Sequence, residues 1–374
     1  MNKLLPFFLI CFSLFFVGCS DDDAPADTDY IPLSPVVLDI TQVPYQKLSD
    51  YKFFVGALKD QQPAYKVLPY KPASELFSDY AHKKRFVWMP AGKKATHNGP
   101  DNALEFPVGT ALIKTFYYDN VLPQLTTKII ETRILIKTTE TTPTNSGWKT
   151  INYIWNDDQT EAYLDTTGDG IFVPIEWQEN GSTKSTIYKV PAFTECATCH
   201  KLNPNQLADG EITIPIGPKP QNLNHNFNYG NVEQNQLQKW IAEGYLENNL
   251  PTNMESTVDW RDTSKSLSLR ARSYIDINCA HCHRDGAHCD YVALRFNFGN
   301  TNTETFGICM VPSQNIQDKP HVISAGSADD SELLVRLSST SQSIMMPIIG
   351  RTVVHQEGVD LITAYINSLN PCQP

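Results

Sequence analysis

The sequence predicts an α+β fold in which a mostly antiparallel β-rich domain, residues 36–190, precedes a helical region that extends to the C-terminus. Up to residue 190, β-branched and aromatic residues alternate between clusters of Gly, Asn and Asp, which is typical of antiparallel strands joined by turns. Beyond that point, apolar residues recur at helical spacing. The chain has 374 residues, which is enough for two or three domains.

Strands are expected where the alternation in the β-rich domain is clearest, at residues 106–118, 132–137, 150–155 and 171–177. The segment from Asp165 to Glu176 partly matches the spacing of a calcium-binding EF-hand loop. Thr167 breaks the third ligand position, and strands rather than helices flank the segment. We therefore favour a hairpin turn over a calcium site.

Three segments beyond residue 190 show helical periodicity, at residues 231–247, 265–277 and 352–369. Asn231 is the expected N-cap of the first of these helices, with Gln234 three residues later. Asn370-Pro371 ends the last of them.

The pattern Cys-x-x-Cys-His occurs twice in the chain, and it is the attachment pattern of c-type haem. Two thiols three positions apart can each add to a vinyl group of one porphyrin, and the adjacent histidine can take an axial position on the iron. The six residues concerned are Cys196, Cys199, His200, Cys279, Cys282 and His283. Two covalently attached haems imply electron transfer.

Zinc is the main competing interpretation, because four cysteines in two pairs can form a tetrahedral thiolate site. Zinc ribbons place their pairs about 15–20 residues apart, whereas Cys199 and Cys279 are much farther apart. Zinc also requires no histidine after each pair. A catalytic redox dithiol needs only one pair. We therefore favour haem.

The usual order of helix, haem motif, ligand loop and closing helix predicts two cytochrome c-like modules, at residues 191–255 and 256–374. Met346 precedes Pro347 and lies six residues before Thr352, so it is the expected second axial ligand of the second haem, with Met345 as the fallback. The alternative is that Met346 only packs in the core.

His225 is the corresponding candidate for the first haem, because it lies six residues before Asn231. The alternatives are a solvated His225, Met254 as ligand, or an open sixth position.

The N-terminus predicts an exported lipoprotein. Residues 1–18 read as a signal peptide, with Lys3 before an apolar run too short for a membrane span. Cys19 is the expected lipidation site, and residues 19–35 form a polar tether. The protein would then face the periplasm or lie on the outer surface of the outer membrane. An ordinary secretory signal with an incidental cysteine is the alternative.

Nine cysteines divide into groups: Cys11 leaves with the signal, Cys19 takes lipid and four take haem. The remaining three lie in an oxidising compartment, which favours one disulfide. Cys289 and Cys309 are the first choice because both belong to the second module, and Cys309 with Cys372 is the alternative.

The formal net charge of −11 argues against nucleic acid as a partner. A redox partner protein with a basic docking face suits this charge better, and the lipid anchor supplies contact with a membrane.

The chain resembles a family of predicted diheme c-type cytochrome lipoproteins of Gram-negative bacteria. The resemblance covers most of the mature chain. It rests on the segments Leu76–Pro90, Phe106–Gly109, Glu131–Arg133, Tyr153–Asn156, Glu195–His200, Arg270–Tyr274, Asn278–His283, Met346–Pro347 and Gly350–Thr352. It implies an exported diheme protein with an N-terminal β region, and it supplies no substrate.

Two functions remain open from the sequence. The first is a membrane-anchored electron carrier between extracytoplasmic redox partners. The second is a peroxidase-like diheme oxidoreductase, which needs an open haem site and acid or base groups above it. The sequence displays no such groups and no catalytic residue is assigned, so the carrier is favoured. A third role, in which the β-rich domain binds a partner or glycan, has no residues that distinguish it.

Overall fold

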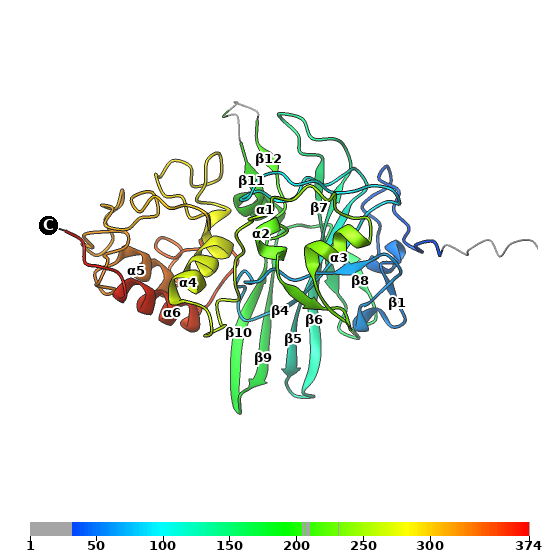
Figure 1. The fold of residues 1–374 in the computed structure, drawn as a ribbon. Coiled ribbons are helices and arrows are strands. Elements are labelled where there is room, and N and C mark those ends of the chain that lie inside the picture. Colours follow the sequence, from blue (N-terminus) through cyan, green and yellow to red (C-terminus); the bar gives the residue numbers. More distant parts are fainter. Residues whose placement is uncertain (1–31, 204–205, 207–209, 231, 374) are drawn as a thin grey trace, which may run out of the picture. The chain divides into compact units, whose positions relative to one another are not determined.

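An antiparallel sheet of eight strands is the central element of the computed structural model, which describes residues 32–203, 206, 210–230 and 232–373 (Figure 1). The strand order is β10-β9-β5-β6-β7-β8, and β4 pairs with β5 and β3. The strands are β3 (Leu68–Pro69), β4 (His82–Trp88), β5 (Ala111–Val121), β6 (Thr126–Lys137), β7 (Trp148–Trp155), β8 (Ala162–Leu164), β9 (Ile171–Glu179) and β10 (Ser182–Val190). The predicted β-rich N-terminal region is confirmed.

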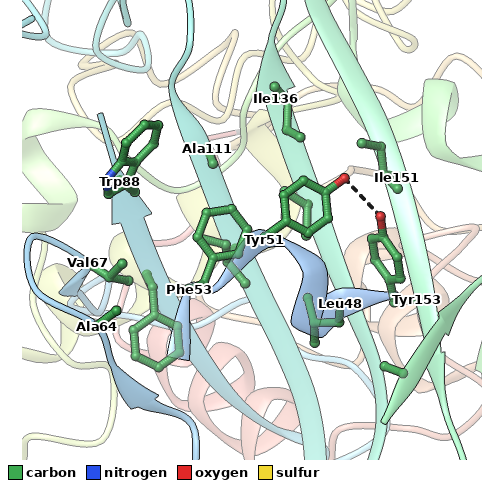
Figure 2. Packing of buried hydrophobic residues seen from close by; sticks show 14 of the residues in the cluster. Leu48, Tyr51, Phe53, Ala64, Val67, Trp88, Ala111, Ile136, Ile151 and Tyr153 are labelled. Carbon is green, nitrogen blue, oxygen red and sulfur yellow. Dashed lines mark hydrogen bonds between the residues drawn. The ribbon is translucent and has the colours of Figure 1, made fainter. Parts of the chain in front are cut away.

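One face of the sheet is covered by the segment that precedes it in the chain (Figure 2). This segment contains η1 (Leu48–Tyr51), β1 (Phe54–Val55), η2 (Leu58–Asp60) and β2 (Gln62–Pro63). Tyr51 and Phe53 are fully buried against Ile113 and Ile134 of the sheet. The hydroxyl of Tyr153 lies 2.9 Å from that of Tyr51, so the polar ends of the two buried rings bond to each other.

The opposite face of the sheet carries two separate apolar clusters. At one end, Leu112 packs with Leu237 and Trp240 of helix α3 (Gln236–Ala242). At the other end, Phe116 packs with residues of β9 and β10. Between the two clusters, the same face borders a cavity, which is described below.

The predicted helical half of the fold is wrong, because no two helical cytochrome c-like modules follow residue 190. Strands contain 26% of the residues and helices 18%, so strand residues exceed helical ones. The elements beyond residue 190 are short: α1 (Phe193–His200), β11 (Lys201–Leu202), β12 (Ile212–Thr213), α2 (Pro220–Leu223), β13 (Asn226–Asn228), β14 (Glu233–Asn235), α3, α4 (Leu267–Ile275), η3 (Asp276–Ala280), α5 (Glu332–Ser338) and α6 (Gln356–Asn367).

The first module is absent because helix α3 packs against a different surface from the one expected. Its apolar face packs on the sheet and not across the first Cys-x-x-Cys-His segment, so the described part of residues 191–255 encloses no core of its own. Asn235 is its N-cap, accepting the N–H of Leu237 at 3.0 Å. The expected N-cap, Asn231, lies outside the described residues.

Helices α4 and α6 lie close to the expected helical segments and share one apolar core. They approach closely at Gly358, where an added Cβ would lie 2.1 Å from the hydroxyl oxygen of Tyr274. Only glycine permits this packing.

The sheet and the C-terminal region belong to one compact unit, residues 34–374. Asp79, which precedes β4, joins them. Its buried carboxylate accepts the N–H of Thr352 at 2.6 Å, the hydroxyl of Thr352 at 3.0 Å and the N–H of Val353 at 3.2 Å. These bonds hold the segment before α6 against the sheet.

We expect Asp79→Ala to lower the free energy of unfolding by about 2 kcal/mol, because buried donors left without partners cost about 1–3 kcal/mol. Urea unfolding measures this change. The matched control is Asp157→Ala at an exposed position, where the change should stay within about 0.5 kcal/mol. Equal unfolding midpoints for the two variants would show that the contact is unimportant for stability.

The predicted signal peptide, the lipidation site Cys19 and most of the tether lie in residues 1–31, outside the described residues. Along the part of the chain that the structure describes, no helix combines the length and apolar character needed to cross a membrane.

Candidate functional site

The first Cys-x-x-Cys-His segment forms the helix α1. Glu195 caps the start of this helix, because its carboxylate accepts the N–H of Ala192 at 2.9 Å. Helical residues three and four positions apart share one face. One cavity is therefore lined by the motif side chains Cys196, Cys199 and His200, together with Glu195 of the same helix. We call it the first cavity.

The imidazole of His200 is held by the hairpin of β11 and β12. Its Nδ1 lies 2.7 Å from the carbonyl oxygen of Ile214, which follows β12. This hydrogen bond places a proton on Nδ1 and leaves the lone pair on Nε2. Burial lowers the pKa of His200 to about 4, so the ring is neutral at neutral pH. A neutral imidazole with its other nitrogen bound to a carbonyl is the usual state of a metal ligand.

The second Cys-x-x-Cys-His segment follows α4 and begins within the π-helical turn η3, which contains Cys279. Asp276 anchors the turn: it is buried and pairs with Lys219 at 2.7 Å. One further turn follows, because the N–H of His283 donates to the carbonyl of Cys279 at 3.0 Å. The side chains that line the second cavity include Cys279, Cys282, His283 and Met346.

The two segments meet although they are far apart in the sequence. The ligand atoms of Cys199, His281 and Cys282 all lie within 4.8 Å of one another. Hydrogen bonds from Cys282 and His281 hold the pKa of Cys199 well below its usual range. Cys199 and His281 line both cavities, so the cavities share a wall.

The four thiols do not form a tetrahedral zinc site. Among the described residues, the group with metal-ligand spacing contains Cys199, Cys282 and one histidine, but neither Cys196 nor Cys279. Structural zinc sites almost always have four ligands. Cys196 instead lines only the first cavity, and Cys279 lines only the second.

Each motif borders a cavity that is partly open to solvent. The first cavity lies against β5 and β6, so one of its walls is the β-sheet and not a helical module.

Met346 lies in the wall of the second cavity, together with His283. Met345 is instead fully buried, and its sulfur lies 3.7 Å from the side-chain nitrogen of Gln342. Met254 packs against the cluster around helix α3. Of the three methionines considered as ligands, only Met346 lines either cavity.

The prediction that His225 ligates the first haem is not supported by its position. Its Nε2 lies 2.9 Å from both the carbonyl of Lys71 and the side-chain nitrogen of Gln236, and its Nδ1 lies 2.9 Å from the carbonyl of Asn226. It lines neither cavity. The sequence predicts His225 as a ligand because it lies six residues before the expected closing helix. That helix, α3, packs on the sheet and not beside the first motif.

Two groups of the first cavity were not found from the sequence. His355 precedes α6 and stacks on Phe77 with ring centres 4.1 Å apart. Its Nδ1 lies 2.9 Å from the hydroxyl oxygen of Tyr274, and burial lowers the pKa of His355 to about 4. Lys114 of β5 is the second group. A lysine between the apolar residues Leu112 and Phe116 on one face of a strand is a signal that the sequence does contain.

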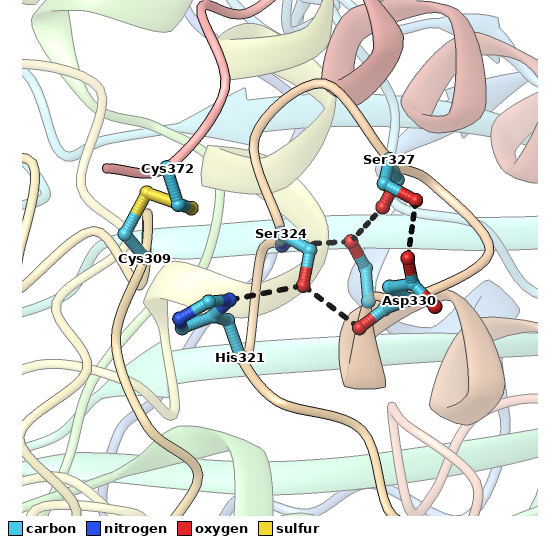
Figure 3. The surroundings of a disulfide bond; sticks show 7 residues. Cys309, His321, Ser324, Ser327, Asp330 and Cys372 are labelled. Atoms are coloured by element: carbon cyan, nitrogen blue, oxygen red, sulfur yellow. Dashed lines mark hydrogen bonds between the residues drawn. A yellow bond between two sulfur atoms is a disulfide. The ribbon is translucent and has the colours of Figure 1, made fainter. Parts of the chain in front are cut away.

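The predicted disulfide between Cys289 and Cys309 is wrong, because Cys309 bonds to Cys372 (Figure 3). Cys289 is buried and free in the wall of the second cavity. Its N–H donates to the carbonyl of Cys282 at 3.0 Å, which holds it beside the motif. The chain after α6 brings Cys372 to Cys309, with Cα atoms 5.6 Å apart.

The hairpin expected at Asp165 is also wrong, because the adjoining strands β8 and β9 are not neighbours in the sheet. The Asp165 carboxylate accepts the N–H groups of Thr167 at 3.1 Å and Gly168 at 3.0 Å, which forms a local turn. The segment is therefore a connection between separate strands.

No family model, no curated protein and no solved structure matches this chain.

Proposed function

We propose that this protein is an exported, membrane-anchored c-type cytochrome that holds two covalent haems and carries electrons between extracytoplasmic redox partners. The supporting observation is the pair of adjoining cavities, each lined by one complete Cys-x-x-Cys-His set. Neither a zinc ribbon nor a redox dithiol needs two such cavities.

The donor sets fit this cofactor. Each thiol adds across one vinyl group: sulfur bonds to the carbon next to the ring, and the thiol proton goes to the terminal carbon. His200 offers Nε2 in the first cavity, because its Nδ1 is bound to Ile214. His283 and Met346 face the same second cavity. When bound, each haem supplies an iron that exchanges one electron.

The junction of Cys199 and Cys282 supports a direct electron path. Each of these residues would carry one thioether, and their sulfur atoms lie within 4.8 Å of each other. Cys199 and Cys282 would therefore hold the two haems at the wall that the cavities share, beside His281. Electron exchange is the chemistry that the two haems would supply there.

The location and partners are proposed from the sequence. The signal at residues 1–18 and the lipid at Cys19 would tether the protein to a membrane. The net charge of −11 would favour a partner with a basic docking face. The resemblance to diheme cytochrome lipoproteins of Gram-negative bacteria agrees with this assignment.

Haem content tests the proposal. We expect two haems per mature chain by haem staining of denaturing gels and by the pyridine haemochrome spectrum. Cys196→Ala/Cys199→Ala and Cys279→Ala/Cys282→Ala should each retain one haem. The control Cys289→Ser, at the free cysteine outside both motifs, should retain two. A colourless wild-type protein that contains zinc would rule out the proposal.

A diheme oxidoreductase is the second candidate, and one observation favours it. His355 and Tyr274 line the first cavity, whereas His225 does not. They are acid and base groups of the kind that peroxide chemistry uses. A high-spin first haem that binds cyanide and reacts with peroxide would favour this candidate. A low-spin first haem inert to both favours the carrier.

A further inference from the structure

The sheet face beside the first cavity carries basic residues between its apolar clusters. Along β5, Leu112 belongs to one cluster and Phe116 to the other, and Lys114 lies between them on the same face. Arg85 of β4 and Arg133 of β6 lie directly opposite Lys114 in the register of the sheet. We call these three residues the basic row.

Two carboxylates neutralise the charges at the ends of the basic row. Glu75 accepts a hydrogen bond from the guanidinium of Arg85 at 2.7 Å, and Glu131 accepts one from the Nε of Arg133 at 2.9 Å. Glu131 also accepts the hydroxyl of Tyr188 at 2.7 Å. Like charges that face each other across strands destabilise a sheet, so the middle of the row still needs an anion.

The side-chain ammonium of Lys114 forms no ion pair and no hydrogen bond with any residue that the structure describes. Its ammonium lies 4.7 Å from the ring centre of Phe116, and the guanidinium of Arg133 lies 4.4 Å from the same centre. Burial, followed by the charges of Arg85 and Arg133, holds the pKa of Lys114 well below its usual range. A poorly solvated cation without an anion is costly.

Lys114 and Arg133 both line the first cavity, so an anion there can reach them from the side that the sheet leaves open. We propose that these two residues bind a carboxylate in the first cavity. A bound anion would favour the protonated form of Lys114, and one such cation suits an anion with a single charge. A carboxylate accepts hydrogen bonds from ammonium and guanidinium groups. Apolar contacts come from other parts of the wall, among them Leu112 and Leu135, and the lining also contains Lys189, Glu195 and Arg351.

The carboxylate has two chemical sources. One is a propionate side chain of the haem attached at Cys196 and Cys199, and this source rests on the proposed function. The other is a free organic acid, which does not require a haem. Both place the same group on the same residues, so binding measurements with and without the first haem separate them.

The test uses the full chain with Cys196→Ala/Cys199→Ala, which prevents attachment in the first cavity. Sodium propionate is the probe, titrated by calorimetry at constant chloride. We expect binding that Lys114→Met weakens at least 10-fold, about 1.4 kcal/mol. The control is Lys84→Met, on the other face of β4, where the ammonium contacts the carbonyl of Asp60. It should leave the affinity unchanged.

The same titration of wild-type protein distinguishes a haem propionate from a free organic acid as the source of the carboxylate. If it binds no added propionate while the cysteine variant does, the haem's own carboxylate occupies the site. If both bind equally, the site takes a free organic acid. Binding in neither, or equal binding after Lys114→Met, overturns the proposal. Haem content is counted separately, so a failure of the proposed function is recognised independently.

Resonance Raman spectra of the intact protein give a second measurement if the cysteine variant does not fold. The propionate bending modes of one haem should shift in Lys114→Met and not in Lys84→Met. Unshifted modes in both variants exclude the haem propionate, and the proposal is then overturned if the wild type binds no added propionate. A change of the first haem from low-spin to high-spin in Lys114→Met also overturns it, because the amine would then be an iron ligand.

Discussion

Met346→Ala is expected to lower the reduction potential of one haem by about 0.1 V or more, because axial ligands tune haem potentials over roughly 0.8 V. A thioether ligand favours ferrous iron and raises the potential. Among the three candidate methionines, only Met346 shares a cavity with a motif histidine, His283. Its loss should therefore affect the second haem and leave the first nearly unchanged.

Two measurements check this result. A redox titration should show that only the upper of two waves moves, and the weak near-infrared sulfur-to-iron band should disappear. Met345→Ala is the matched control, because its side chain is buried outside both cavities. It should keep the band while lowering stability through lost packing. A band that survives Met346→Ala and disappears in Met345→Ala would reverse the assignment.

Cys309→Ala/Cys372→Ala is expected to lower the free energy of unfolding by about 4 kcal/mol. The disulfide joins residues 63 positions apart, and closing a loop of this length removes about that much conformational free energy from the unfolded chain. The bond also ties the segment after α6 to the loop that carries Cys309 (Figure 3). Urea unfolding of oxidised protein measures the change.

Cys289→Ala separates the two disulfide pairings. If Cys309 bonds to Cys372, this variant keeps the disulfide and loses only the packing of one small buried side chain. Peptide mapping without reduction should recover the Cys309–Cys372 linkage from it. Recovery of a peptide that links Cys289 to Cys309 in the wild type would contradict the structure.

Local features of the fold were predicted well because they depend on neighbouring residues. Alternation located β7 and β9, and helical periodicity located α4 and α6 near their observed ranges. These local patterns do not predict which surface each apolar face packs against. Helix α3 has the amphipathic pattern of a helix that closes a haem module, yet Trp240 packs with Tyr70 and Phe106. A periodic pattern predicts burial of a face and not the surface that buries it.

The sequence by itself determined the two Cys-x-x-Cys-His sets, since their spacing alone places each set on one side of a helical turn. It also predicted the β-rich region. Only the tertiary structure decided that Cys199 meets Cys282, that Cys309 bonds to Cys372, and that Lys114 faces a cavity. These contacts join residues far apart in the chain. They depend on how whole surfaces pack, which no local pattern of residues specifies.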